Sequence, residues 1–274
     1  MKLKLPDVTY VMQETQAHEL ALLAIKDCVD KVDFAEVLVF TDRPLEFSPL
    51  TSICEHRVIT VPNWQSKLDW CRFNWFGVPQ EVKTSHMLLC QWDAWVWDVD
   101  MWRDEFLQYD LVGAPWWYES KNVGNTGFCL KSSRLARYVS ANRDKYPCIK
   151  AIEDDLLCRT YRPMLEERGF LWAPERVAYD FAYEGCVALD GSGTKRAKEM
   201  LNRRERHFGF HGTFNFRHVL DRDGLRKRAE LMIANPYIKE NYMMRSFVET
   251  NMDLIHEIVG DKYDKLRVAA DAAE

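Results

Sequence analysis

Residues 8–40 read VTYVMQETQAHELALLAIKDCVDKVDFAEVLVF, and this stretch indicates the fold. A β-rich run over Val8–Met12 gives way to polar residues, and apolar residues at helical spacing then extend over His18–Val29. Further strands are expected over Glu36–Phe40 and Arg57–Val61. Strands that alternate with helices in this way predict a mostly parallel sheet with helices on both faces, an α/β fold.

The rest of the chain extends this pattern. A buried strand is expected over Thr84–Cys90 and another over Phe128–Leu130, with helices over Ser133–Asn142 and Asp154–Arg168. From Leu220 onward the residues are typical of polar helices. We therefore expect one α/β domain over residues 1–219 and a helical C-terminal extension over residues 220–274.

Composition excludes several classes of protein. Of the 274 residues, 47% are hydrophobic and 29% are charged, which excludes a disordered or fibrous chain. The 37 basic and 42 acidic residues give a net charge of -5, which argues against a general nucleic-acid binder. The eight cysteines form no C-x-x-C pair, and we find no signal-peptide pattern and no apolar run long enough to span a membrane. These features predict a cytoplasmic protein without a transmembrane segment.

The segment MLLCQWDAWVWD, residues 87–98, carries the sharpest chemical signal. Asp93 follows a buried strand, where a rigid and partly desolvated carboxylate suits a hard divalent cation, and Gln91 lies two residues before it. The alternative is an aspartate that only caps a turn. A literal D-x-D pair, Asp98 and Asp100, comes next, but Asp100 is better placed to cap a helix.

Three further segments could contribute to a site. Glu153, Asp154 and Asp155 are consecutive at a helix start, where they either pair with the helix dipole or supply a general base for a sugar hydroxyl. His211 lies between aromatic residues and glycines and is either a ligand or a hydrogen-bonded structural histidine. The loop Gly124–Gly127 offers backbone N–H groups to an anion or a sugar, although tight turns use the same residues.

In combination these segments resemble a known family. The order QWD, W-x-D-E-F-L-x-Y-D-x-x-G-A-P-W, V-G-N-x-G-F-x-L, E-D and F-G-F-H-G is similar to a glycosyltransferase-like family that is grouped with the GT-A nucleotide-diphospho-sugar transferases. The resemblance covers residues 84–216, about half of the chain. It implies a GT-A-like, Rossmann-like three-layer sandwich and an enzyme that uses a nucleotide-sugar.

The resemblance also implies roles for individual residues. Asp93 and His211 would bind Mn²⁺ or Mg²⁺ on the donor diphosphate, and Gln91 replaces the first acid of the family's D-x-D motif. Of the acidic pair Glu153 and Asp154, we favour Asp154 as the base that activates the acceptor. The remaining expected contacts of the donor are Glu14, Thr15, Asp42 and Trp92, and those of the sugar or acceptor are Trp116, Trp117, Gly124, Asn125 and Thr126.

The function implied is metal-dependent transfer of a sugar from a nucleotide-diphospho-sugar, with a UDP-linked donor and inversion at the anomeric carbon. The acceptor would be a hydroxyl of a glycan or another molecule. Retention of configuration stays open, because a C-terminal histidine also occurs in retaining enzymes. A binding module that has lost turnover is the main alternative, supported by Gln91. A two-metal phosphoesterase ranks last because too few clustered ligands are visible. The sequence does not indicate an oligomeric state.

Overall fold

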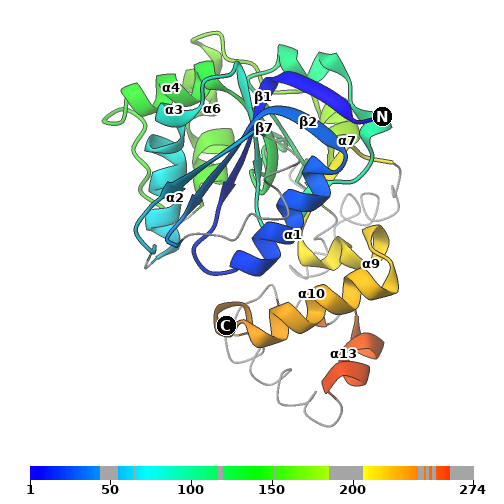
Figure 1. Cartoon of the computed structure of the whole chain (residues 1–274). Helices are drawn as coiled ribbons and strands as arrows, with labels where there is room; N and C mark the ends of the chain where they lie inside the picture. Colours follow the sequence, from blue (N-terminus) through cyan, green and yellow to red (C-terminus); the bar gives the residue numbers. More distant parts are fainter. Residues whose placement is uncertain are drawn as a thin grey trace.

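The structure is a computed structural model (Figure 1). It describes residues 1–43, 55–64, 66–116, 120–150, 152–184, 206–239, 244, 247–248 and 251–259. At its centre lies a sheet with the strand order β3-β2-β1-β4-β7-β6. These strands span Leu3–Gln13 (β1), Val32–Thr41 (β2), His56–Thr60 (β3), His86–Cys90 (β4), Leu111–Gly113 (β6) and Phe128–Ser132 (β7).

The first four strands of this order are parallel, whereas β7 runs antiparallel to both β4 and β6. The predicted fold class, α/β with a mostly parallel central sheet, is therefore confirmed. Because β1 and β4 are parallel neighbours, their carboxyl ends, Gln13 and Cys90, lie at the same edge of the sheet. Open α/β sheets bind ligands beyond this edge.

Helices cover both faces of the sheet (Figure 1). On one face, α1 (His18–Val29, the predicted range) and α7 (Glu175–Phe181) pack in the same cluster as Tyr10 and Met12 of β1. On the other face, α3 (Val78–Glu81) and α4 (Ser133–Ala141) pack in the same cluster as Val11. The alternation of these β1 residues reflects the two-residue period of a strand.

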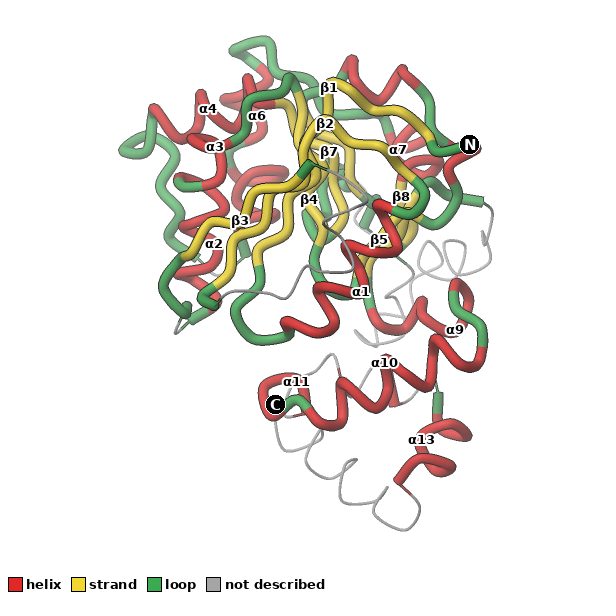
Figure 2. The backbone as a smooth tube through the Cα atoms, viewed as in Figure 1, coloured by secondary structure: helices red, strands yellow, loops and turns green. Residues whose placement is uncertain are grey.

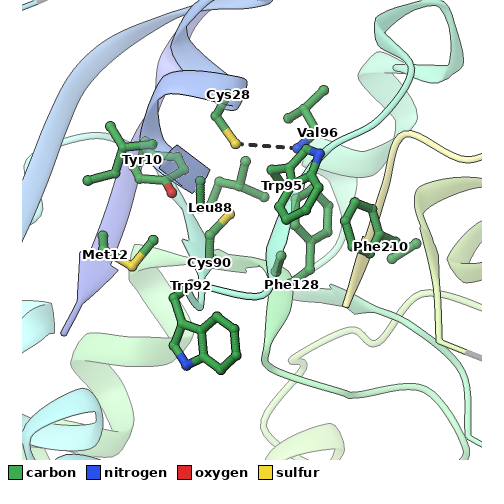
Figure 3. Close-up of a cluster of buried hydrophobic side chains, with 14 of the residues drawn as sticks. Tyr10, Met12, Cys28, Leu88, Cys90, Trp92, Trp95, Val96, Phe128 and Phe210 are labelled. Carbon is green, nitrogen blue, oxygen red and sulfur yellow. Dashed lines mark hydrogen bonds between the residues drawn. The ribbon is translucent and has the colours of Figure 1, made fainter. Parts of the chain in front are cut away.

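A second, small sheet has the strand order β5-β9-β8, with β5 at Ala94–Val96, β8 at Ala182–Tyr183 and β9 at Gly209–His211. Its aromatic side chains join the main core, which Figure 3 shows in close-up. The rings of Trp95 and Phe210 meet edge to face with centroids 4.5 Å apart. Strands of two or three residues are too short to show a periodicity, and the sequence did not predict β8 or β9.

The helix predicted over Asp154–Arg168 is broken into three pieces. They are α5 (Glu153–Asp155), a π-helical turn η3 (Leu156–Thr160) and α6 (Arg162–Glu166). Pro163 lies in the first turn of α6, where its missing N–H and its ring favour a new helix start over a continuing helix. A similar break separates α2 (Lys67–Phe76) from α3, next to Pro79.

The C-terminal extension lies beside α1 in the views of Figures 1 and 2. Its described helices are α10 (Arg222–Ala234), α11 (Pro236–Lys239) and α13 (Met252–Val259), and the short helix α9 (Phe216–Val219) directly precedes it. Arg228 of α10 is buried, forms an ion pair with Asp27 of α1, and lies 4.4 Å from the ring centre of Trp95. The extension thus packs on the α/β core, and the boundary at residue 219 stays a prediction. Across the described ranges, no helix has the length and apolar character needed to cross a membrane.

Candidate active site

Asp93 and His211 meet beyond the carboxyl end of β4. Asp93 lies in the turn that joins β4 to β5, and β5 pairs antiparallel with β9, so that Ala94 lies opposite His211. The Gly212 N–H donates to the Asp93 carbonyl oxygen at 3.1 Å and extends this pairing. As a result, Nε2 of His211 lies 3.6 Å from Oδ1 of Asp93.

Two further residues enclose the imidazole of His211. Nδ1 lies 3.1 Å from Oε1 of Glu184, which directly follows β8. Gly127 lies against the ring so closely that a Cβ atom at this position would be 2.2 Å from both Cδ2 and Nε2. The N–H of Gln91 donates to the Gly127 carbonyl at 2.9 Å and fastens this loop to the turn that carries Asp93. The glycine is therefore required by a close approach to the histidine.

Burial and charge shape the electrostatics of this pair. Asp93 is only 2% exposed, and its Oδ1 has no hydrogen-bond partner among the described residues. Burial raises the pKa of the Asp93 carboxyl. Burial lowers the pKa of His211, but the negative charges of Asp93 and Glu184 outweigh it and raise that pKa to about 9. When no other cation is bound, the protonated imidazole of His211 offsets the negative charges of the Asp93 and Glu184 carboxylates.

Asp93 and His211 could supply part of the coordination shell of a metal ion, with a bound ligand supplying the rest. Among the described residues, no group of three or more His, Cys, Asp or Glu side chains could hold a metal ion. Asp93 Oδ1 nevertheless lacks a hydrogen-bond partner among those residues and faces Nε2 of His211. Mg²⁺ is commonly held by one or two carboxylates together with substrate phosphates and water. Asp93 and His211 thus fit an ion whose other ligands come from a diphosphate and water.

The acidic pair divides into a buried member and a more accessible one. Glu153 is 4% exposed and accepts hydrogen bonds from Oγ1 of Thr126 at 2.8 Å and from Sγ of Cys71 at 3.1 Å. Asp154 accepts one from the N–H of Asp155 at 2.8 Å. Burial and the charge of Glu153 raise the pKa of Asp154 to about 7. The structure thus gives the Asp154 carboxyl a pKa that suits a general base near neutral pH.

The residues expected to hold the nucleotide lie at the ends of β1 and β2. Oε1 of Glu14 accepts the N–H groups of Gln16 at 2.5 Å and Ala17 at 2.8 Å, and burial raises the pKa of Glu14. Thr15 is buried beside it. The Glu14 carboxylate therefore shapes the start of the loop between β1 and α1.

Asp42 uses both of its carboxylate oxygens within the protein. Oδ1 lies 2.7 Å from Nε2 of His18, and Oδ2 accepts a hydrogen bond from Nδ2 of Asn63 at 2.8 Å. The Asn63 side chain also accepts from Nε2 of Gln16 at 3.0 Å. Asp42 therefore ties three segments at this edge of the sheet together, and a direct contact with a donor stays a prediction.

Trp92, expected to contact the donor, and Trp116, expected to contact the sugar or acceptor, both lie inside the protein. Trp92 is 4% exposed and belongs to the main core, and Trp116 is 7% exposed and packs in a second cluster. Figure 3 shows the Trp92 ring beneath Cys90 and Met12. Trp117 lies outside the described residues. We therefore leave Trp92 and Trp116 out of the contacts proposed below.

The loop of Gly124, Asn125 and Thr126 directs its polar side chains inward. Oδ1 of Asn125 accepts from the Gly127 N–H at 2.9 Å, and Thr126 donates to Glu153. Gly124 has a φ of 154°, and a Cβ there would lie 2.4 Å from Sγ of Cys158. These bonds hold the loop against His211, and contact with an acceptor stays a prediction.

The literal D-x-D pair lies in the turn after β5 and is engaged there. Asp98, not Asp100 as expected, caps the short helical turn that follows, by accepting from the Asp100 N–H at 3.1 Å. Both carboxylates also bind Arg206. This pair has a structural role that Asp93 lacks.

Sequence reasoning missed two charged residues of the site. Glu184 stands in no recognisable motif, and only the pairing of β8 with β9 brings it to His211. Lys67 begins α2. Burial raises the pKa values of Asp93 and Asp154, and the positive charge of Lys67 lowers both. Positive charge is unfavourable near the N-terminus of a helix, so a lysine there is unusual. This was the signal in the sequence that could have singled out Lys67.

Comparison with known sequences identifies the family. Residues 69–211, just over half of the chain, match the family described as "Protein of unknown function (DUF5672)". The chain therefore belongs to the DUF5672 family. No curated protein sequence matches it.

Solved structures provide a second comparison. Similar chains include a mannosyltransferase from Pyrobaculum calidifontis, in complex with GDP-Man and Mn²⁺ (10% identity, TM-score 0.45, 97% of this chain and 73% of that one). The glycosyltransferase GlyE of Streptococcus pneumoniae (10%, 0.49, 94% and 63%) and mouse xyloside xylosyltransferase 1 (9%, 0.46, 77% and 98%) are similar as well. All three are glycosyltransferases.

Proposed function

We propose that this protein is a metal-dependent glycosyltransferase that moves a sugar from a nucleotide-diphospho-sugar to an acceptor hydroxyl. One observation carries the proposal: Asp93 Oδ1, buried and without a hydrogen-bond partner among the described residues, faces Nε2 of His211 at 3.6 Å. This pair lies at the sheet edge where α/β proteins bind ligands. The negative charge of Asp154 also raises the pKa of His211, so the proposed base lies near the two residues that would hold the metal ion.

Asp93 and His211 would hold Mn²⁺ or Mg²⁺. When bound, such an ion supplies positive charge to the donor diphosphate and stabilises it as a leaving group. Lys67 is a further source of positive charge, because it already acts on the carboxyls of Asp93 and Asp154. Fixed cations aimed at developing negative charge stabilise the transition state without the cost of reorganising solvent.

Asp154 takes the proton of the acceptor hydroxyl. The acceptor oxygen forms a bond to the anomeric carbon while the bond from that carbon to the diphosphate oxygen breaks, and the proton ends on the Asp154 carboxylate. Attack opposite the leaving group inverts the configuration. With a pKa of about 7, the Asp154 carboxyl is about half ionised at neutral pH, as suits a general base. Glu153 contributes by its charge, which raises that pKa.

We extend the proposal to a UDP-linked donor whose nucleotide lies at the ends of β1 and β2, near Glu14, Thr15 and Asp42, with Gln91 beside the diphosphate. The acceptor would approach near the loop Gly124–Thr126. A cytoplasmic location also belongs to the proposal. The six described cysteines are free and buried, as in proteins of reducing compartments.

A binding module without turnover is the second candidate. Gln91 in place of an acid favours it, as does the self-contained Asp93–His211–Glu184 arrangement, in which the imidazolium itself could bind a diphosphate. Such a module would bind nucleotide without added metal and would leave the donor intact.

Calorimetric titration of UDP and of GDP, with Mn²⁺ and then with EDTA, separates the two candidates. The transferase proposal expects nucleotide binding only with metal, together with slow metal-dependent hydrolysis of the matching sugar donor. Asp93→Ala should abolish both, whereas Asp100→Ala, which changes an exposed carboxylate of the nearby D-x-D pair, should change neither. Absence of metal-dependent binding to either nucleotide in a folded sample would contradict the proposal.

A further inference from the structure

We propose that Glu184 is a positioning residue that holds His211 in the ring orientation and tautomer required to bind the metal ion. This inference rests on the proposed function, since it concerns the ion that Asp93 and His211 would share. Nothing in the sequence pattern singles out Glu184. The packing of the second sheet does.

Strand pairing brings the two side chains together. β8 and β9 are parallel, with Ala182 opposite Gly209 and Tyr183 opposite Phe210. One residue further along the same register, Glu184 comes beside His211, and its Oε1 lies 3.1 Å from Nδ1. The contact therefore follows from the backbone arrangement.

The two carboxylates lie on different nitrogens of the ring. Nδ1 faces Glu184, and Nε2 faces Asp93 at 3.6 Å. When Nδ1–H donates to Glu184, the Nε2 lone pair points toward Asp93 Oδ1 and is available to a metal ion. Glu184 itself lies on the Nδ1 side, so it orients the ligand and does not share the ion with Nε2.

The surroundings make this arrangement rigid. The Glu184 side chain is 11% exposed and that of His211 is 15% exposed, so water screens their interaction only weakly. Gly127 packs against the ring and limits its movement. Carboxylates that accept the second N–H of a metal-bound histidine fix its tautomer and raise its basicity, and their loss typically lowers metal affinity by about 10–100-fold.

The test measures Mn²⁺ binding by the full chain, in the presence of UDP and separately of GDP, with electron paramagnetic resonance. Pulsed measurements of the bound ion report a coordinated imidazole nitrogen directly. Glu184→Ala should weaken Mn²⁺ binding by about 10–100-fold and reduce the nitrogen signal. Glu184→Gln keeps an oxygen acceptor for Nδ1–H and should recover most of the affinity. Glu167→Ala removes an exposed carboxylate at the end of α6 and serves as the matched control.

Circular dichroism and melting curves establish that each variant is folded, and Glu184→Met, which keeps the side-chain length but removes the acceptor, carries the test if Glu184→Ala does not fold. Wild-type binding with a nitrogen signal that Glu184→Ala leaves unchanged would overturn the role of Glu184 while the proposed function stands. Equal loss in Glu184→Ala and Glu184→Gln would also overturn it, because a direct ligand behaves in that way. Absence of Mn²⁺ binding by the wild type with either nucleotide would overturn both the proposed function and this inference.

Discussion

The contact between Gly127 and His211 gives a sharp test of the site, because one added methyl group would displace one metal ligand. Gly127 does not have a positive φ, so Gly127→Ala introduces no left-handed backbone strain. The new Cβ would lie 2.2 Å from Cδ2 and Nε2 of His211 and 2.6 Å from Cε1. The perturbation is therefore purely steric and is aimed at the nitrogen that faces Asp93.

Carbon atoms in contact are normally about 3.5–4.0 Å apart, so the ring or the loop must move by more than about 1 Å. Misplacement of a catalytic group by about 1 Å can lower the rate about 100-fold. Overpacking of this kind also costs about 1–3 kcal/mol of folding stability. In a chain of this size, each kcal/mol lowers Tm by about 2–4 °C.

We expect Gly127→Ala to fold, to melt a few degrees below the wild type, and to lose most metal-dependent nucleotide binding. Calorimetry with Mn²⁺ and nucleotide measures the binding loss, and donor hydrolysis measures the rate. Gly77→Ala is the matched control, because its Cβ would lie 2.5 Å from the Phe73 ring, between α2 and α3. It should lower Tm similarly and preserve binding. Wild-type Mn²⁺ affinity and rate in folded Gly127→Ala would refute the reasoning about His211.

The other predictions concern Asp154, Thr126 and Arg228. The transfer rate should fall as the pH drops below about 7, because Asp154 must be ionised, and Asp154→Asn should bind donor and metal without transfer. The pKa of Asp154 is higher in the folded state than in the unfolded state. The contribution of this group to stability is therefore present at acid pH and is lost as the pH rises toward 7. At pH 8, Asp154→Asn should melt at a higher temperature than the wild type. Thr126→Val removes a donor to the buried Glu153 and should lower the free energy of unfolding by about 1–3 kcal/mol in denaturant titrations, whereas Thr126→Ser should be close to wild type. Arg228→Ala should lower the free energy of unfolding by about 2–3 kcal/mol, which is less than the ~3–5 kcal/mol lost when a fully buried ion pair is broken, because Asp27 is 32% exposed. The same substitution should speed hydrogen exchange in α10. Unchanged exchange would show that the ion pair does not hold the extension.

Local sequence patterns predicted most of the fold. The apolar spacing of residues 18–29 was enough to predict α1 to its observed ends, because a two-sided sheet imposes a clear helical face on the helix that covers it. The uninterrupted apolar run of residues 87–90 likewise predicted β4 as a buried strand, although the strand begins at His86 and not at Thr84 as expected. The broken helix after Glu153 was not predicted, although Pro163 carried the signal.

The sequence by itself determined the chemical types present at the candidate site: an aspartate after a buried strand, an acidic pair and a histidine among glycines. Tertiary structure decided which of them lie together. Asp93 and His211 meet because β5 pairs with β9, and Glu184 joins them because β8 pairs with the same strand. Pairing between short, distant strands depends on the packing of the whole domain and leaves no local periodicity. The same holds for the acidic pair, because burial and the hydrogen bonds from Thr126 and Cys71 distinguish Glu153 from its neighbour, and those donors come from other segments of the chain.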